Sequence, residues 1–161
     1  MKSAVYMLML ISVAVYADQA SKKIFSKRIC EGNTCKWYRF INRQVAYADA
    51  ELYCRRNWNN GRLVSIHSAT ENASVLRLVK RSCGNRVPYA WIGAVQLMES
   101  IHFIWTDGSI WNYNNWIPGQ PDNINPHGTE ACAEIFTAND RPGQWNDDHC
   151  GFKRAFICQH F

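Results

Sequence analysis

Side chains that carry oxygen are concentrated in one part of this sequence. Gln120 and Asp122 are separated by a single proline, Glu130 follows them, and Asn146 and Asp147 are adjacent further along. A mixture of carboxylate and amide oxygens is the ligand set that Ca²⁺ prefers in proteins. Three of these five side chains are carboxylates, and a bound divalent ion would relieve their mutual repulsion. The sequence therefore predicts a functional calcium site formed by these five residues.

The elements that must position this site lie on either side of a loop. Residues 112–128 show neither a helical nor a strand period, so we interpret them as a long functional loop. Aromatic and β-branched content predicts strands at residues 35–41, 63–66, 90–93, 103–105, 131–136, 144–146 and 156–159. The apolar spacing predicts a helix over residues 45–57. A second helix begins with a capping box at Ser68 and Glu71, runs to about Arg81 and ends near Gly84.

The first 17 residues have the layout of a secretory signal peptide. Lys2 supplies the charged start, residues 4–15 form the apolar core, and Ala17 ends a small-residue cleavage site. The apolar run is too short to favour a membrane span, and no second run of spanning length follows. We therefore predict a secreted, extracellular protein cleaved before Asp18, with a basic arm over residues 18–34 and one domain over residues 35–161.

The basic excess of the chain is moderate. Lys and Arg number 18 against 13 Asp and Glu, which gives a formal net charge of +5. Much of the excess lies in the arm, at Lys22, Lys23, Lys27 and Arg28. We interpret the arm as solvated, with attraction to anionic glycans or membranes as the alternative. We expect no nucleic-acid partner.

Seven cysteines in a secreted chain of this size indicate disulfides. They are Cys30, Cys35, Cys54, Cys83, Cys132, Cys150 and Cys158. The odd count leaves at least one without a partner in the same chain, and spacing alone leaves the connectivity open.

Several short motifs follow one another in a specific order. They are the helix with Cys54, then Trp91-Ile92-Gly93, Gln120-Pro121-Asp122, Glu130-Ala131-Cys132, Trp145-Asn146-Asp147 and Phe156-Ile157-Cys158. In this order they resemble the C-type lectin-like domain family over about residues 35–161. The resemblance implies a disulfide-stapled α+β fold with two helices, two small antiparallel sheets and a long calcium-binding loop.

The resemblance also assigns roles to individual residues. It implies disulfides Cys54–Cys158 and Cys132–Cys150, calcium ligands Gln120, Asp122, Glu130, Asn146 and Asp147, and a cis bond before Pro121. Gln-Pro-Asp is similar to the galactose-type arrangement of this family. It implies binding of galactose, N-acetylgalactosamine or lactose on cell or microbial glycans, with an agglutinating or innate-defence role. The sugar contacts would come from Gln120, Asp122, Glu130 and Asn146.

Some positions depart from the family pattern or leave alternatives open. No tryptophan follows the motif, so His127 is the nearest ring for stacking on a sugar, with an exposed loop histidine as the default. Cys30 fits a local ring with Cys35, a bond to Cys83, or a bond to another chain. Cys83 is either an interchain disulfide or a buried thiol. We favour the interchain bond, since multivalency suits a homo-oligomeric lectin. Asn72 begins a glycosylation sequon.

The sequence also allows other functions to be considered. A zinc site from His127, His149 and a carboxylate lacks close metal-binding spacing, and no hydrolase motif supports an enzyme. Trp37, Trp91, Trp105, Trp111 and Trp116 are expected to pack in the core or loops, not to stack on ligands. An ice-binding protein of the type II antifreeze kind and a venom-type protein-binding module are the alternatives on the same fold.

Overall fold

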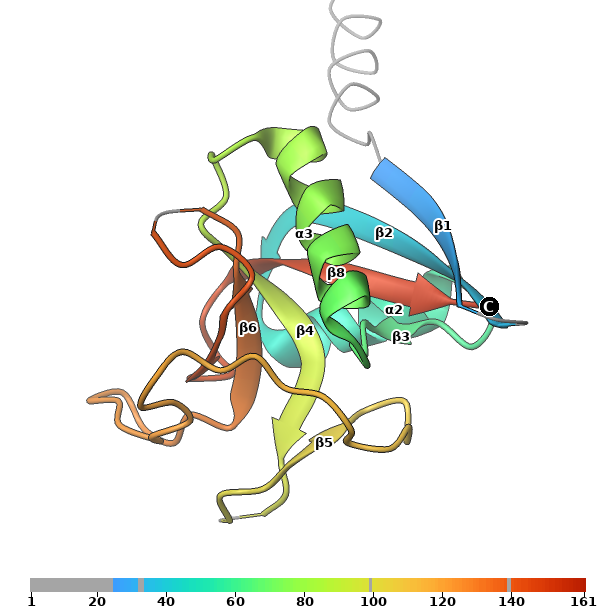
Figure 1. Cartoon of the computed structure of the whole chain (residues 1–161). Coiled ribbons are helices and arrows are strands. Elements are labelled where there is room, and N and C mark those ends of the chain that lie inside the picture. The colour runs from blue at the N-terminus through green and yellow to red at the C-terminus, as the bar shows by residue number, and fades with distance from the viewer. Residues whose placement is uncertain (1–24, 32–33, 99, 139) are drawn as a thin grey trace, which may run out of the picture.

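The computed structural model describes residues 25–31, 34–98, 100–138 and 140–161. Its elements, in chain order, are β1 (Phe25–Glu31), β2 (Thr34–Val45), α2 (Tyr47–Asn57), β3 (Arg62–Leu63), α3 (Ala69–Cys83), β4 (Tyr89–Gln96), β5 (Phe103–Trp105), β6 (Cys132–Phe136), β7 (Trp145–Asp148) and β8 (Arg154–His160). This is the expected α+β architecture with two helices (Figure 1).

The strands form two antiparallel groups, and a short pairing between β4 and β8 joins one group to the other. The path runs β1-β2-β8-β4-β6-β7, with β3 paired to β8 and β5 paired to β4. All pairings are antiparallel except the short one between β4 and β8, where Ala90 lies opposite Ala155 and Trp91 opposite Phe156. The two small sheets that we expected are therefore the two halves of one continuous sheet.

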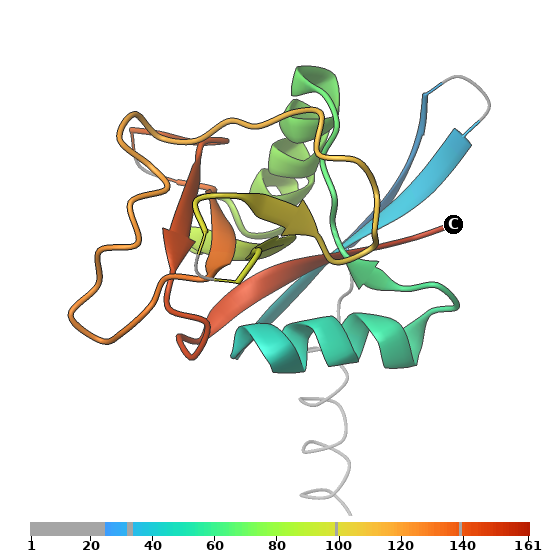
Figure 2. The ribbon, with the colours of Figure 1, turned by 90° about the horizontal axis from the view of Figure 1, so that it is seen from below.

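The two helices cover opposite faces of this sheet (Figures 1 and 2). Successive residues of β8 alternate between the two sides, as a strand requires. Ile157 belongs to the buried cluster that includes Val79 of α3, whereas Phe156 and Cys158 belong to the cluster that includes Ala50 of α2. The later, orange part of the segment between β5 and β6 and the β1–β2 hairpin lie at opposite ends of the molecule (Figure 2).

The ends of α3 show how the sequence fixes a helix. Ser68 Oγ accepts a hydrogen bond from the Glu71 N–H at 3.1 Å, as a capping box requires. The Glu71 carboxylate accepts from the N–H of His67 at 2.6 Å, one residue before the cap. At the other end, Gly84 has a φ of +61°, a conformation that glycine adopts without steric cost.

Three disulfides staple the fold: Cys30–Cys35, Cys54–Cys158 and Cys132–Cys150. Cys83 is a free thiol, 4% exposed, and its sulfur lies 3.2 Å from the Val79 carbonyl oxygen. Burial raises the pKa of this thiol. The interchain bond that we favoured requires an exposed sulfur, so this location supports the buried-thiol alternative instead.

The basic arm ends earlier in the chain than expected. From Phe25 the backbone pairs with β2, where Phe25 lies opposite Phe40. Phe25 and Ile29 pack against the core, and the Cys30–Cys35 disulfide closes the hairpin. Residues 1–24, with the predicted signal peptide and cleavage site, lie outside the described residues. Within the described residues, no helix combines the length and the apolar character needed to cross a membrane.

Candidate functional site

Three carboxylates meet where the β5–β6 loop reaches β7. Asp122 comes from the loop, Glu130 lies shortly before β6, and Asp147 lies on β7. One carboxylate oxygen from each lies within 4.8 Å of those of the other two. Glu130 and Asp147 are 6% and 0% exposed, whereas Asp122 is exposed. The cluster thus has a buried floor and one carboxylate that faces solvent.

Gln120 joins this cluster through the backbone of Asp122. The Gln120–Pro121 peptide bond is cis, as the family resemblance implied. The Asp122 N–H donates to Gln120 Oε1 at 3.0 Å and lies 3.3 Å from Asp147 Oδ1. Gln120 Nε2 in turn donates to Asp122 Oδ2 at 3.2 Å. The amide oxygen of Gln120 and a carboxylate oxygen of Asp147 therefore lie beside the same N–H.

Two asparagines that the sequence analysis did not select hold the loop against the cluster. The Asn123 N–H donates to Asp147 Oδ2 at 2.9 Å, and Asn123 Oδ1 accepts from the Glu130 N–H at 2.7 Å. Asn125 Nδ2 donates to Glu130 Oε1 at 2.9 Å and lies 3.2 Å from Asp148 Oδ1. These two residues could have been selected from the sequence because asparagine side chains in turns tend to hydrogen-bond the backbone.

Asn146 lies beside the cluster on the same strand as Asp147. Its side-chain amide donates to the Asp147 carbonyl oxygen at 2.5 Å, and it lies opposite Glu134 in the β6–β7 register. Among the described residues, no hydrogen bond joins the Asn146 side chain to the loop carboxylates. Its role as a fifth ligand stays a prediction.

The carboxylates of the cluster destabilise one another's charged forms. The pKa of Glu130 is raised to about 7, first by burial and then by the charges of Asp147, Asp148 and Asp122, although the hydrogen bond from Asn125 opposes this. Burial and the Asp122 charge also raise the pKa of Asp147. A divalent cation placed among these oxygens would favour the ionised forms.

The chemistry of the donors fits calcium. The metal-type cluster found among the described residues contains only carboxylates, and Gln120 adds an amide oxygen, whereas zinc sites usually include histidine or cysteine. His127 and His149, the residues considered for zinc, instead pack edge-on against Phe152 with ring centroids 5.5 Å apart in each case.

A shallow groove of about 100 Å³ borders the cluster on the side of the β4–β5 hairpin. Ile101, Phe103 and Pro121 supply its apolar wall, and Asp122 and Asp147 supply its acidic edge. Ile101 is 81% exposed. An apolar surface therefore stands next to the exposed carboxylate, where the sequence analysis had considered only His127.

Trp145, which precedes the two predicted ligands of β7, is anchored to α3. Its indole N–H donates to Asn72 Oδ1 at 2.9 Å, and Asn72 Nδ2 donates to the Gly143 carbonyl oxygen at 2.9 Å. Asn72 is only 6% exposed. The Asn72 nitrogen that would carry a glycan is therefore buried and already donates a hydrogen bond, which argues against use of the sequon in the folded protein.

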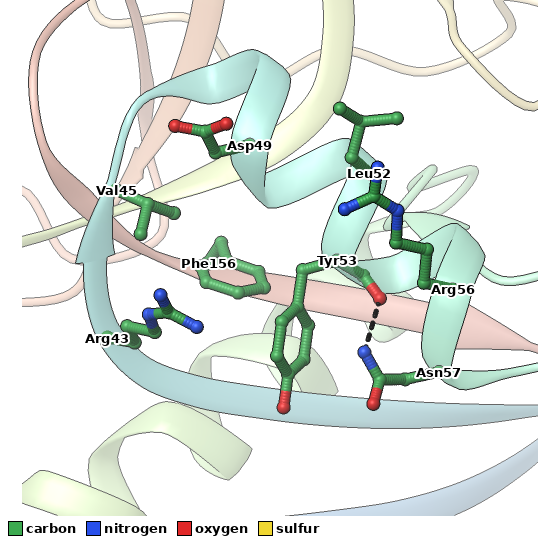
Figure 3. A pocket seen from close by; sticks show the side chains of 8 residues that line it. All are labelled: Arg43, Val45, Asp49, Leu52, Tyr53, Arg56, Asn57 and Phe156. Atoms are coloured by element: carbon green, nitrogen blue, oxygen red, sulfur yellow. Dashed lines mark hydrogen bonds between the residues drawn. The ribbon is translucent and has the colours of Figure 1, made fainter.

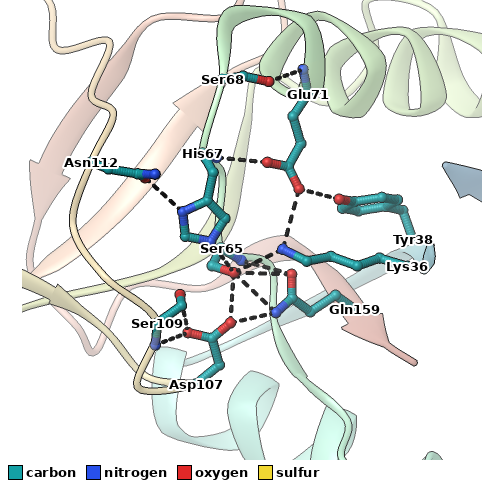
Figure 4. A network of polar contacts seen from close by, with 10 residues as sticks. All are labelled: Lys36, Tyr38, Ser65, His67, Ser68, Glu71, Asp107, Ser109, Asn112 and Gln159. Atoms are coloured by element: carbon teal, nitrogen blue, oxygen red, sulfur yellow. Dashed lines mark hydrogen bonds and ion pairs between the residues drawn. The ribbon is translucent and has the colours of Figure 1, made fainter. Parts of the chain in front are cut away.

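A second polar cluster has the residue types of a hydrolase triad (Figure 4). His67 lies between Asn112 Oδ1, 2.8 Å from Nδ1, and Ser65 Oγ, 3.1 Å from Nε2. Ser65 is fully buried, and its hydroxyl lies 2.6 Å from Asp107 Oδ2 and 3.2 Å from Gln159 Oε1. A nucleophile must reach its substrate, and the buried Ser65 hydroxyl does not meet this requirement in the structure.

Comparison with known proteins identifies the family. The family model of the lectin C-type domain matches residues 43–160, and the chain therefore belongs to the C-type lectin domain family. It is 32% identical over 149 residues to a lectin from Pleurodeles waltl, across 88% of this chain and 84% of that protein.

Two further relatives agree with this assignment. The galactose-specific lectin nattectin from Thalassophryne nattereri is 35% identical over 128 residues, across 79% of this chain and 74% of that protein. The crystal structure of the C-type lectin CEL-I from Cucumaria echinata has a TM-score of 0.69 and 32% identity, across 82% of this chain and 93% of that chain.

Proposed function

We propose that this protein is a secreted, calcium-dependent lectin for galactose-type sugars, which acts by recognition and not by catalysis. The observation that carries the proposal is the placement of Gln120 and Asp122 beside the buried carboxylates of Glu130 and Asp147. The similarity to a lectin named for galactose supports the sugar class, and the signal-peptide pattern supports secretion.

The residues of the site would act on both the ion and the sugar. Calcium, when bound, supplies coordination positions that two neighbouring sugar hydroxyls can fill in place of water. The Gln120 and Asn146 amides offer an oxygen to the ion and N–H groups to the sugar, and Asp122 accepts a hydroxyl proton. The order of donor and acceptor across Pro121 then selects hydroxyl pairs that include an axial group.

Retention on galactose and mannose resins, each with calcium and with EDTA, tests the proposal. We expect retention on galactose that EDTA abolishes. Failure to bind either resin would contradict the lectin assignment and would direct attention to thermal hysteresis and protein partners. Retention that persists in EDTA would contradict the role of calcium.

The double exchange Gln120→Glu with Asp122→Asn tests which residues select the sugar. It keeps one amide and one carboxylate but reverses their order, so preference should move toward mannose by about tenfold. Continued galactose preference would show that this tripeptide does not control specificity. The single change Asp140→Ala, at an exposed aspartate, serves as the control.

A lectin agglutinates cells or microbes only if each lectin assembly carries more than one sugar-binding site. We therefore include a homo-oligomer in the proposal, held by non-covalent contacts because Cys83 is buried. Size-exclusion chromatography under non-reducing conditions checks this, and a strictly monomeric protein would contradict it.

A further inference from the structure

A second groove lies between the end of β2 and α2 (Figure 3). Its volume is about 280 Å³, near the lower limit for small-ligand pockets, so it suits a single ring better than a larger molecule. Arg43 from β2 and Arg56 from α2 border it, with the rings of Tyr53 and Phe156 between them (Figure 3). None of the residues that line it belongs to the carboxylate cluster.

The two arginines of this groove are available for a ligand. Neither Arg43 nor Arg56 forms an ion pair or a side-chain hydrogen bond with any residue in the described ranges. By contrast, Arg55 pairs with Glu51 at 2.7 Å on the same helix. Asp49 also lines the groove but lies beyond ion-pair distance of both arginines. The groove therefore presents an excess of unpaired positive charge.

A row of rings and cationic groups continues from the groove along the sheet. Tyr53 contacts Trp58 edge-on, with ring centroids 6.1 Å apart. The Arg39 guanidinium lies 5.2 Å from the Trp58 ring and 5.6 Å from the Trp37 ring, and its Nε donates to His160 Nε2 at 3.0 Å. Trp37 is 36% exposed. Positive groups and aromatic rings thus alternate along this side of the sheet, where Tyr53, Trp58 and Arg39 are half-buried and Phe156 is buried beneath them.

We propose that this groove and row bind an acidic polysaccharide, independently of calcium and of the proposed galactose site. A guanidinium fork matches the two oxygens of a carboxylate or a sulfate. Aromatic faces pack against the apolar face of a sugar ring. A chain of charged sugar rings repeats both features at short intervals, and the alternation of arginines and rings on this surface is complementary to it.

Binding of the intact, disulfide-bonded protein to immobilised heparin in EDTA tests the proposal. Arg43→Ala with Arg56→Ala should weaken heparin binding at least about tenfold, since two charge-assisted contacts are lost. Both side chains are exposed and unpaired, so the melting temperature should stay unchanged. The matched control is Arg81→Ala with Arg141→Ala, which removes the same charge from two exposed positions elsewhere and should retain wild-type binding.

Additional polymers identify the ligand chemistry. Retention of hyaluronan, which carries carboxylates without sulfates, would assign recognition to the carboxylate, and retention of heparin alone would assign it to the sulfate; both results agree with the proposal. Equal loss of heparin binding in the control variant would reduce the effect to overall charge and overturn the proposal. Polyglutamate bound as tightly as heparin would overturn it in favour of an acidic peptide.

Discussion

Two polar clusters in this protein use similar side chains and reach opposite electrostatic states. Burial alone would raise the pKa of Asp107, but hydrogen bonds from Ser109, Ser65 and Gln159 outweigh it and lower the pKa (Figure 4). Around Glu130, burial and then the charges of neighbouring carboxylates raise the pKa to about 7. Around Asp107, hydrogen-bond donors of the protein itself stabilise the ionised carboxylate. The ionised carboxylates around Glu130 would instead be stabilised by a positively charged ligand.

The largest effect should follow from Asp147→Ala, which removes one of the two buried carboxylates of the carboxylate cluster. Calcium affinity should fall at least about a hundredfold, because even residues behind the ligands typically contribute tenfold to a hundredfold. Sugar retention should be lost with it, while the disulfide-bonded body stays folded. Calorimetric calcium titration and a melting curve measure both effects.

Asp140→Ala is the matched control for this change, because Asp140 is exposed. Its calcium affinity should equal that of the wild type. Unchanged calcium affinity in Asp147→Ala would place the ion elsewhere and remove the contrast between the two clusters.

The cluster drawn in Figure 4, which includes Ser65, Glu71 and Asp107, is here called the donor-rich cluster. A substitution there should lower the stability of the fold. The Glu71 carboxylate accepts from the Tyr38 hydroxyl, from Lys36 Nζ at 3.3 Å and from the His67 N–H at 2.6 Å (Figure 4). Glu71→Ala removes the buried acceptor that these three donors share and should lower the free energy of unfolding by about 3 kcal/mol. Urea unfolding with intact disulfides measures this, and the exposed neighbour Thr70→Ala should cost less than about 0.5 kcal/mol.

Calcium affinity provides the cross-check on Glu71→Ala. If the two clusters are independent, the folded variant binds calcium like the wild type. A large fall in affinity would show that the donor-rich cluster also supports the loop.

A smaller effect is expected at the contact that joins α3 to β7. Asn72→Ala leaves the buried Trp145 N–H without its acceptor and should cost about 2 kcal/mol of unfolding free energy. Calcium affinity should fall severalfold, since Trp145 positions β7. Asn85→Ala, at an exposed asparagine, is the control. A glycan found on Asn72 by mass spectrometry would contradict the buried contact.

The smallest expected effect is a loss of folding stability at low pH. Because the pKa of Asp107 in the folded state lies below its ordinary value of 3.8, the native state binds fewer protons than the unfolded state at low pH. Its contribution to stability is present above that value and is lost as the pH falls through the folded pKa. Unfolding of the wild type and of Asp107→Asn, followed from neutral pH into acid, should show a steeper acid loss in the wild type. Identical pH profiles would contradict this assignment.

The elements could be predicted because their signals are local, and the carboxylate cluster could be predicted because its short motifs stand in the order typical of a known family. The capping residues Ser68 and Glu71 lie within one helical turn, and strand patterns surround Trp91. Asp122 and Asp147 were reached through an ordered set of short motifs. The helix and strand signals are contained in a few consecutive residues, and the order of the motifs can be seen in the sequence without knowledge of the fold.

The missed features depend on contacts between distant parts of the chain. Asn123 holds its place through the carboxylate of Asp147, which no local pattern encodes. The Asn72 sequon and Cys83 both resemble surface features, yet packing buries them. Ile101 lies in a hairpin far from the motifs and reaches the site only through the fold.

The position of β8 has a consequence for how the protein is made. Among the described residues this strand comes last, yet it lies between β2 and β4 at the middle of the sheet. During translation the strands on either side emerge long before the one that joins them, and Cys54 waits for a partner 104 residues further on. Until residues 154–160 leave the ribosome, both inner edges of the sheet stay open to wrong pairing. The Cys54–Cys158 disulfide can therefore form only after residues 154–160 have emerged, and the yield of folding depends on the folding factors present at that stage.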